Sequence, residues 1–194
     1  MSERPPERPQ LFPLFLRLAG KDVLVVGAGA VAERKIEDLV QAGATVRVVA
    51  LEATPAVESL AEQGRISLSR RAFEDADVGG AWLVVAATTD PDVQARACAG
   101  ADHARTFSIA VDDPPNGSAY SASVIRRQPF TIAISSSGEA PALSRLLREV
   151  LEQALPEAEW VEAARELRAR WRSERTPMSS RFADLVRAFK ERAG

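Results

Sequence analysis

Apolar positions follow two alternating spacings over the first 110 residues of the chain. Short apolar runs indicate strands buried on both faces, and the segments between them repeat apolar residues every three or four positions, as amphipathic helices do. Strands are expected at residues 23–26, 45–49, 66–68, 82–86 and 107–111, and helices are expected to begin at Ala30, Thr54 and Asp90. Repeated strand–helix–strand units predict a parallel sheet with right-handed crossovers and helices on both faces.

Two details refine this pattern. The first helix is expected to end at Gly43 and to carry one apolar stripe made of Val31, Ile36, Leu39 and Val40. Residues 66–68 alternate between apolar and polar side chains, which is typical of a strand at the edge of a sheet.

The pattern changes after residue 112. Residues 113–117 break it, and two strands are then expected at 118–125 and 130–135, which should pair antiparallel because no helix separates them. A lone two-stranded hairpin is marginally stable in water, so we expect a partner such as the same hairpin of a second subunit. Three helices should follow, at residues 142–155, 157–172 and 180–192. The last two of these helices should pack inward through Leu167, Trp171, Phe182, Leu185, Val186 and Phe189.

Composition excludes several classes of protein. One His and one Cys cannot build a zinc ribbon, an iron–sulfur site or a disulfide framework, so no metal held by the protein is predicted. The net charge of -2 argues against general capture of nucleic acid. No apolar run approaches the ~20 residues of a membrane span, and the first residues lack the apolar core of a signal peptide. We therefore expect a cytoplasmic protein in which Cys98 is a free, buried thiol.

Residues 27–32 read Gly-Ala-Gly-Ala-Val-Ala between the first strand and the first helix. This is the context of the dinucleotide-binding fingerprint, in which the first glycine makes a tight turn, the second admits a pyrophosphate, and the small third residue permits close packing. We therefore predict an α/β fold of the Rossmann type, with Gly27 and Gly29 as cofactor-binding residues. The predicted organisation is a disordered lead-in (1–10), an NAD-binding domain (11–113), a dimerisation hairpin with a Ser-rich loop (114–140) and a helical domain (141–194).

The second strand leads into the segment that should bind the cofactor ribose. It runs Val49-Ala50-Leu51-Glu52, so an Asp directly at the strand end is missing, and either Glu52 or backbone groups around Leu51 would hold the hydroxyls. Residues 50–53 contain no Arg or Lys to bind a 2′-phosphate, which favours NAD over NADP.

Two later strands end in polar residues at the same expected edge of the sheet. Thr88 follows the fourth strand and Asp112 follows the fifth, so both should meet the glycine loop in one crevice, with Asp112 as the catalytic candidate. The alternative for Asp112 is a turn-forming role ahead of the prolines. Beyond the hairpin, Ser136 lies in a Ser-rich loop before a helix start, and nearby arginines, including Arg126 and Arg145, would suit a polycarboxylate ligand.

Several motifs together resemble the precorrin-2 dehydrogenase / sirohydrochlorin ferrochelatase family of siroheme biosynthesis. The residues that carry the likeness lie between 11 and 155, in the segments 11–15, 25–35, 86–90, 111–112, 134–138 and 141–148. The glycine pattern is common to many families. Its combination with Val-Ala-Glu-Arg-Lys at 31–35 and with the Ser-rich loop before Pro-x-Leu-x-Arg-Leu-Leu-Arg at 141–148 is specific.

The resemblance implies a reaction and a set of roles. It implies NAD-dependent oxidation of precorrin-2 to sirohydrochlorin, Fe(II) insertion in those members that also chelate, and a homodimer formed through the middle segment. By that likeness Asp112 matches the family's proton-handling aspartate and Ser136 a serine near the tetrapyrrole. Cofactor contacts are matched by Ala30, Val31, Leu51 and Glu52.

Two other functions stay open from sequence. A lone Rossmann domain also serves as an NAD-sensing regulatory module, although such a module leaves Asp112 and the Ser-rich loop unexplained. An unrelated NAD dehydrogenase is disfavoured because the chain has neither a Tyr-x-x-x-Lys pair nor a catalytic His–Asp pair.

Overall fold

The computed structural model describes residues 10–155 and 158–193. The predicted disordered lead-in therefore lies outside the described residues, except for residue 10. The described residues form two compact units: the first contains 10–121 together with 137–139, and the second contains 122–136, 140–155 and 158–193. Among the described residues, no helix has the length and apolar character needed to cross a membrane.

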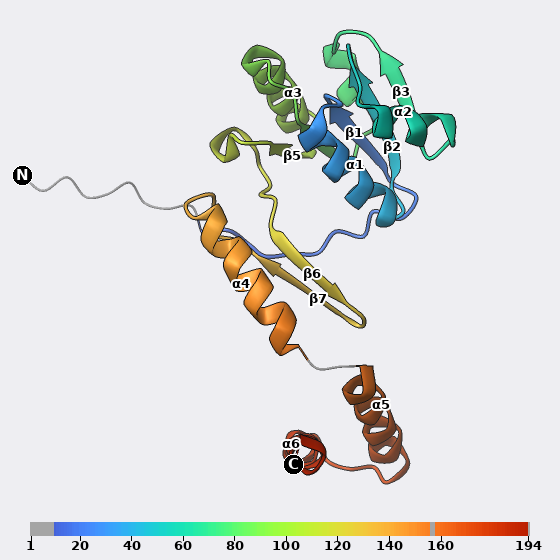
Figure 1. Ribbon diagram of the computed structural model, residues 1–194, viewed down its shortest axis with the longest axis vertical. Helices are drawn as coiled ribbons and strands as arrows, with labels where there is room; N and C mark the ends of the chain where they lie inside the picture. The colour runs from blue at the N-terminus through green and yellow to red at the C-terminus, as the bar shows by residue number, and fades with distance from the viewer. Residues whose placement is uncertain (1–9, 156–157, 194) are drawn as a thin grey trace, which may run out of the picture. The chain divides into compact units, whose positions relative to one another are not determined.

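A five-stranded sheet forms the centre of the first unit (Figure 1). Its strand order is β3-β2-β1-β4-β5. All four strand pairings are parallel, as predicted. The edge position of β3 also agrees with its alternating sequence pattern. The strands are β1 (Asp22–Val26), β2 (Thr45–Ala50), β3 (Ile66–Arg70), β4 (Leu83–Ala86) and β5 (Phe107–Ala110).

Helices cover both faces of this sheet. On one face α1 (Ala30–Gln41) and α2 (Pro55–Glu62) pack against alternate residues of the strands, including Val23 and Val25. The other face, which includes Leu24, packs against α3 (Pro91–His103) and the short 3₁₀ helix η1 (Asp75–Val78). Cys98 of α3 is a free, buried thiol, as expected. Burial of each large apolar side chain contributes about 1.5–3 kcal/mol, so the central strand anchors both layers.

The apolar stripe predicted for α1 is wrong at one position. The buried residues of the helix are Ala32, Ile36 and Leu39, whereas Val31 is 48% exposed. Successive residues lie about 100° apart around a helix, so Val31 cannot share the face of Ala32. Val31 instead lies exposed in the first turn, directly after the glycine loop.

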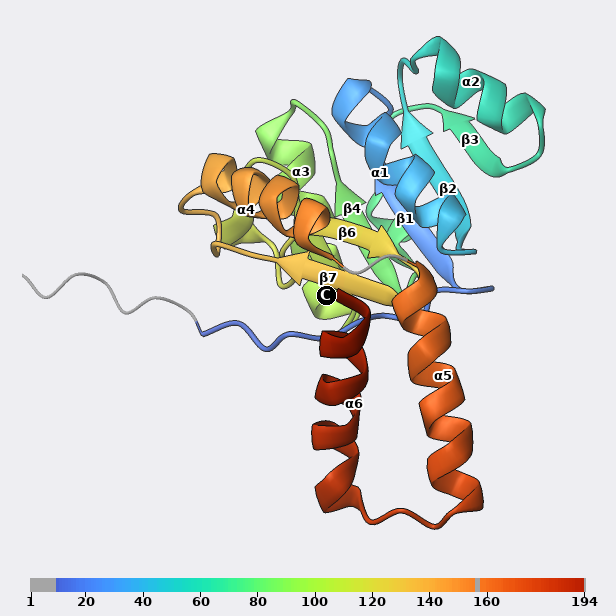
Figure 2. The same cartoon turned by 60° about the horizontal axis from the view of Figure 1, so that its bottom comes forward.

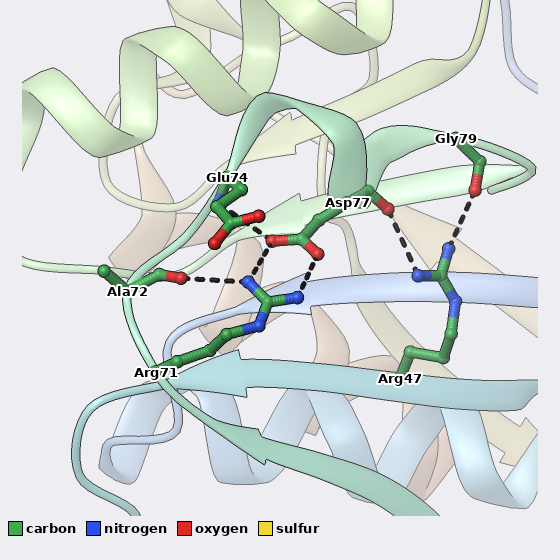
Figure 3. A network of polar contacts seen from close by, with 6 residues as sticks. All are labelled: Arg47, Arg71, Ala72, Glu74, Asp77 and Gly79. Atoms are coloured by element: carbon green, nitrogen blue, oxygen red, sulfur yellow. Dashed lines mark hydrogen bonds and ion pairs between the residues drawn. The ribbon is translucent and has the colours of Figure 1, made fainter.

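Two arginines hold the connection between β3 and β4 (Figure 3). Arg71 donates to both carboxylate oxygens of Asp77, and Asp77 also accepts a hydrogen bond of 2.9 Å from the backbone N–H of Glu74. Arg47 of β2 donates to the backbone carbonyls of Asp77 and Gly79, at 3.2 and 3.1 Å. The hydrogen bond from Arg71 is the main reason that the pKa of Asp77 lies below its usual value.

The second unit begins with an antiparallel hairpin, β6 (Ser123–Arg127) and β7 (Phe130–Ile134) (Figure 2). The antiparallel pairing was predicted, but the expected start of the first strand at residue 118 is wrong. Ser118 belongs to the first unit, where its hydroxyl accepts a hydrogen bond of 2.9 Å from the backbone N–H of Ser108 in β5. The chain therefore follows the edge of the first sheet before it enters the hairpin.

Three helices complete the second unit, α4 (Pro141–Ala154), α5 (Ala158–Ser173) and α6 (Met178–Ala193). Arg127 of β6 joins the hairpin to α4, because its guanidinium donates to the carbonyls of Glu152 and Leu155, at 3.2 and 2.9 Å. These carbonyls lie at the end of α4, where a helix leaves its own acceptors unsatisfied.

The helices α5 and α6 contact each other through only part of the predicted apolar set. Leu167 and Trp171 are buried, and the indole N–H of Trp171 donates to Asp184 at 3.2 Å. The inward packing predicted for Phe182 and Val186 is wrong, since their side chains are 73% and 36% exposed. A pair of helices buries only the seam between them, so side chains beside the seam stay in contact with water.

Candidate functional site

The glycine loop makes a close passage against the end of β4. Gly27 has a φ of +104°, and a Cβ at this position would lie 2.4 Å from the carbonyl oxygen of Ala87. The N–H of Gly27 also donates to the carbonyl of Val49, at 2.9 Å. Only glycine fits both the backbone conformation and the space, so the loop is held tightly between the ends of β2 and β4.

Gly29 has the opposite surroundings. It is the N-cap of α1, no side chain caps this helix, and a Cβ on Gly29 would meet no atom within 4 Å. The exposed residues Ala30 and Val31 follow in the first turn. Uncapped amides at a helix N-terminus, with open space before them, bind anionic phosphate. This end of α1 therefore fits the pyrophosphate of a dinucleotide.

Thr54 fixes the segment that follows β2 onto the glycine loop. Its backbone N–H donates to the carbonyl of Ala28 at 3.0 Å, and its hydroxyl donates to the Glu33 carboxylate at 2.6 Å. The same hydroxyl oxygen accepts from Val57 and so caps α2. Leu51 and Glu52, both exposed, are held beside the loop as a result. Sequence reasoning missed Thr54 as a site residue, although a Thr-Pro helix start was its visible signal.

Thr88 begins the connection from β4 to α3. Its side chain is half-buried, and its hydroxyl oxygen accepts from the N–H of Asp90 at 3.2 Å. Asp90 in turn accepts from the N–H groups of Asp92 and Val93, which caps α3. The capped turn fixes Thr88 at the carboxyl end of β4.

Asp112 follows β5 in an unusual backbone conformation. Its φ is +61°, a left-handed value that few residues other than glycine adopt, although Asp is among those that tolerate it. The side chain is exposed, and no described residue forms a hydrogen bond or ion pair with its carboxylate. The neighbouring Asp113 differs, since its carboxylate accepts from Asn116 at 2.5 Å. The side chain of Asp112 is therefore open to a ligand.

The structure brings these groups to one edge of the sheet. Adjacent parallel strands end at the same edge, which is where ligands bind in open α/β sheets. In spatial order, the edge carries Leu51 and Glu52 after β2, Gly27 and Gly29 after β1, Thr88 after β4, and Asp112 after β5.

The remaining predicted residues lie in the second unit. Ser136 is half-buried, and its hydroxyl accepts from the N–H of Ala140, the N-cap of α4, at 3.1 Å. Arg126 is exposed on β6, and Arg145 is exposed on α4, where it pairs with Glu149 at 3.0 Å. The pairing of Ser136, Arg126 and Arg145 with Asp112 in one substrate site stays a prediction. Among the described residues, no group of His, Cys, Asp and Glu side chains could hold a metal ion.

Two family models match the chain. One, described as putative NAD(P)-binding, matches residues 14–123, and the other, described as sirohaem biosynthesis protein central, matches residues 127–154. The first match covers more than half of the chain and confirms the predicted class of cofactor, a nicotinamide dinucleotide.

Curated relatives of the chain include siroheme synthases. Siroheme synthase 3 of Aeromonas hydrophila is 48% identical over 145 residues, which are 75% of this chain and 31% of the relative. Siroheme synthase 1 of Serratia proteamaculans is 41% identical over 162 residues, or 84% of this chain and 34% of the relative. The chain thus spans about a third of the length of these relatives.

A solved structure has the same fold. SirC, a precorrin-2 dehydrogenase, matches with a TM-score of 0.73 over 91% of this chain and 88% of its own, at 22% sequence identity. This match confirms the predicted class, a Rossmann-type sheet followed by a hairpin and helices. The chain therefore belongs to the putative NAD(P)-binding family, and its residues 127–154 are similar to the central segment of sirohaem biosynthesis proteins.

Proposed function

We propose that the chain oxidises precorrin-2 to sirohydrochlorin with NAD, as a step of siroheme biosynthesis. The main support for this proposal is that Asp112, whose carboxylate is exposed and unpaired among the described residues, lies at the same edge of the sheet as the glycine loop. Support for the substrate comes from the name of SirC and from the siroheme synthase relatives.

The residues present at this edge fit a dinucleotide. Gly27 and Gly29, with the first-turn residues Ala30 and Val31, would hold the pyrophosphate at the start of α1. Leu51 and Glu52 would hold the adenosine ribose, and Thr88 would contact the cofactor from the end of β4. When bound, NAD accepts the hydride that leaves the substrate.

Asp112 is proposed to accept the proton that the substrate loses together with the hydride. A general base must have a free acceptor oxygen within reach of the substrate, and a carboxylate without protein partners meets that need. The left-handed backbone at Asp112 agrees with a functional role, since strained conformations concentrate at active sites.

The substrate carries eight carboxylates, and its contacts are proposed in the second unit. Ser136 accepts a hydrogen bond from Ala140, the N-cap residue of α4, and Ala140 offers no side-chain cap. The amides of this helix start would bind a carboxylate, and Arg126 and Arg145 would bind others. Arg145 would have to exchange Glu149 for the substrate, which an exposed ion pair permits because it contributes little.

The proposal includes a homodimer formed through α4 and the hairpin. Apolar side chains on α4 recur every three or four residues, as Leu143, Leu146, Leu147, Val150 and Leu151, and all five are exposed within one chain. Such a stripe is typical of a helix face that a second subunit covers. The proposed location is the cytoplasm, where Cys98 would stay reduced.

Turnover with precorrin-2 tests the function. Purified chain with precorrin-2 and NAD should form NADH and sirohydrochlorin in equal amounts. Asp112→Asn should lower kcat about 10²- to 10⁴-fold while NAD binding stays unchanged, because it removes a proton acceptor. Asp113→Asn is the matched control, since that carboxylate already bonds Asn116, and it should retain turnover. NAD binding without any turnover would instead favour the NAD-sensing module.

Fe(II) is the second proposed substrate, through insertion into sirohydrochlorin. Asp112 would then accept protons released from the pyrrole nitrogens. Sirohydrochlorin with Fe(II) should be compared with and without the chain, because insertion also proceeds unaided. Equal rates in both samples would remove this step from the proposal.

A further inference from the structure

The structure places a positively charged side chain, that of Arg70, beside the segment proposed to bind the ribose. The sequence alone does not reveal this neighbour. In the pairing of β2 with β3, Arg70 stands opposite Ala50, and Glu52 follows Ala50 by two residues. Residues 50–53 themselves contain no Arg or Lys. Arg70 lies twenty positions further along the chain and reaches this corner only through the register of the sheet.

Arg70 is paired with a carboxylate of α2. Its Nη2 donates to Oε1 of Glu58 at 2.5 Å, and the two side chains are 55% and 38% exposed. Glu58 lies one turn after Thr54, and its backbone N–H donates to the carbonyl of Thr54 at 3.0 Å. Because Thr54 is bonded to Ala28 of the glycine loop, the pair stands on a segment fixed to the cofactor edge.

The next arginine, Arg71, is not available in the same way. Both oxygens of the buried Asp77 accept from it, and it also donates to the carbonyl of Ala72 at 3.0 Å (Figure 3). The partner of Arg71 is therefore enclosed, whereas the partner of Arg70 is open to water. Of Arg70, which ends β3, and Arg71, which follows it, Arg70 is the one that a ligand phosphate can reach.

We propose that the Glu58–Arg70 pair determines the choice between NAD and NADP. The inference rests on the cofactor binding in the proposed function and deepens it. A 2′-phosphate on the ribose would meet two carboxylates, Glu58 and Glu52, against one guanidinium, so the local charge disfavours NADP. Without the Glu58 carboxylate, the planar guanidinium of Arg70 would bind that phosphate through two hydrogen bonds.

Calorimetric titrations of NAD and NADP test this selectivity by binding alone. Glu58→Gln should tighten NADP binding roughly three- to tenfold, as expected for removing one exposed charge near a phosphate, and leave the Kd of NAD unchanged. Glu62→Gln is the matched control, since it removes a carboxylate one turn further along α2, and it should change neither Kd. Adding Arg70→Ala to Glu58→Gln should abolish the gain in NADP affinity.

The possible outcomes distinguish the inference on cofactor selectivity from the proposed dehydrogenase function. If the wild-type chain binds NAD but Glu58→Gln leaves the NADP-to-NAD ratio of Kd values unchanged, the selectivity inference is overturned and the proposed function stands. If the wild-type chain binds neither cofactor, both are overturned. Arg70→Ala alone provides a second measurement, and it should weaken NADP binding further without affecting NAD.

Discussion

In the first unit, Val23, Leu24 and Val25 of the central strand have no exposed surface, whereas Leu143, Leu146 and Val150 of α4 in the second unit are 52–55% exposed. The first unit encloses its apolar residues because helices cover both faces of the sheet. The hairpin and α4 form only two layers, so one apolar face stays uncovered within one chain. The comparison supports the proposed second subunit, which would cover the exposed apolar face of α4.

A large effect on the stability of the first unit is expected at Gly27. Gly27→Val would place side-chain atoms against the backbone of Ala87 and force a β-branched residue to a φ of +104°, so we expect a loss of about 2–4 kcal/mol in the free energy of unfolding. Urea unfolding followed by circular dichroism measures it. Gly29→Ala is the control, because its methyl group meets no atom within 4 Å, and it should unfold like the wild type. Equal losses in both variants would contradict the assignment of the tight passage to Gly27.

A matched pair of truncations compares the two units directly. Ile36→Ala in the enclosed core should cost about 2–5 kcal/mol of unfolding free energy, because it leaves a cavity. Leu146→Ala on the uncovered face should cost less than about 0.5 kcal/mol in the monomer. Unfolding at low protein concentration separates these values, and a similar cost at both positions would mean that α4 is already covered within one chain.

Light scattering during gel filtration measures the oligomeric state and so tests whether a second subunit covers α4. Leu146→Glu should convert the proposed dimer to a monomer, because it places a charge in the apolar stripe. Glu152→Gln changes a charge on the other side of α4 and should leave the dimer intact. A dimer that survives Leu146→Glu would locate the subunit contact elsewhere.

A modest effect is expected at the ion pair between Arg71 and Asp77, in the connection between β3 and β4. Asp77→Asn should cost about 1–2 kcal/mol at neutral pH, a modest value because Arg71 is partly exposed. Since the pKa of Asp77 is lower in the folded state, its contribution is present above the unfolded pKa of about 3.8 and is lost as the pH falls through the folded pKa. The wild type and the variant should thus converge in stability in acid.

Unfolding free energies at a series of pH values check this convergence. Asp75→Asn is the control on the same 3₁₀ helix, because its ion pair with Arg96 is exposed and should contribute little. A stability difference for Asp77→Asn that persists unchanged in acid would show that hydrogen-bond geometry, not charge, is what Asp77 contributes to stability.

The features that the sequence predicted correctly are those with a local signal. Periodicity located the five strands and their helices, and the spacing of the glycines marked the cofactor edge. Residues whose role depends on distant partners were missed. Thr54 acts through Ala28 and Glu33, and Arg70 stands beside Ala50 only because of the strand register.

The remaining errors also have physical reasons. Ser118 carries strand-like sequence but bonds the edge of β5, a choice that depends on which strand edge is free. Phe182 is apolar yet exposed, because periodicity shows which face of a helix is apolar and not whether anything covers it. The same limit applies to Asp112, whose left-handed backbone has no signature in its neighbours.

The passage at Gly27 has a consequence for how the protein tolerates mutation. The atoms that a side chain at position 27 would meet are the carbonyl oxygen and carbon of Ala87. Every residue type carries these atoms, so no replacement of Ala87 can make room. A screen for suppressors of Gly27→Val should therefore recover only reversion to glycine. No substitution elsewhere should compensate for the loss of Gly27.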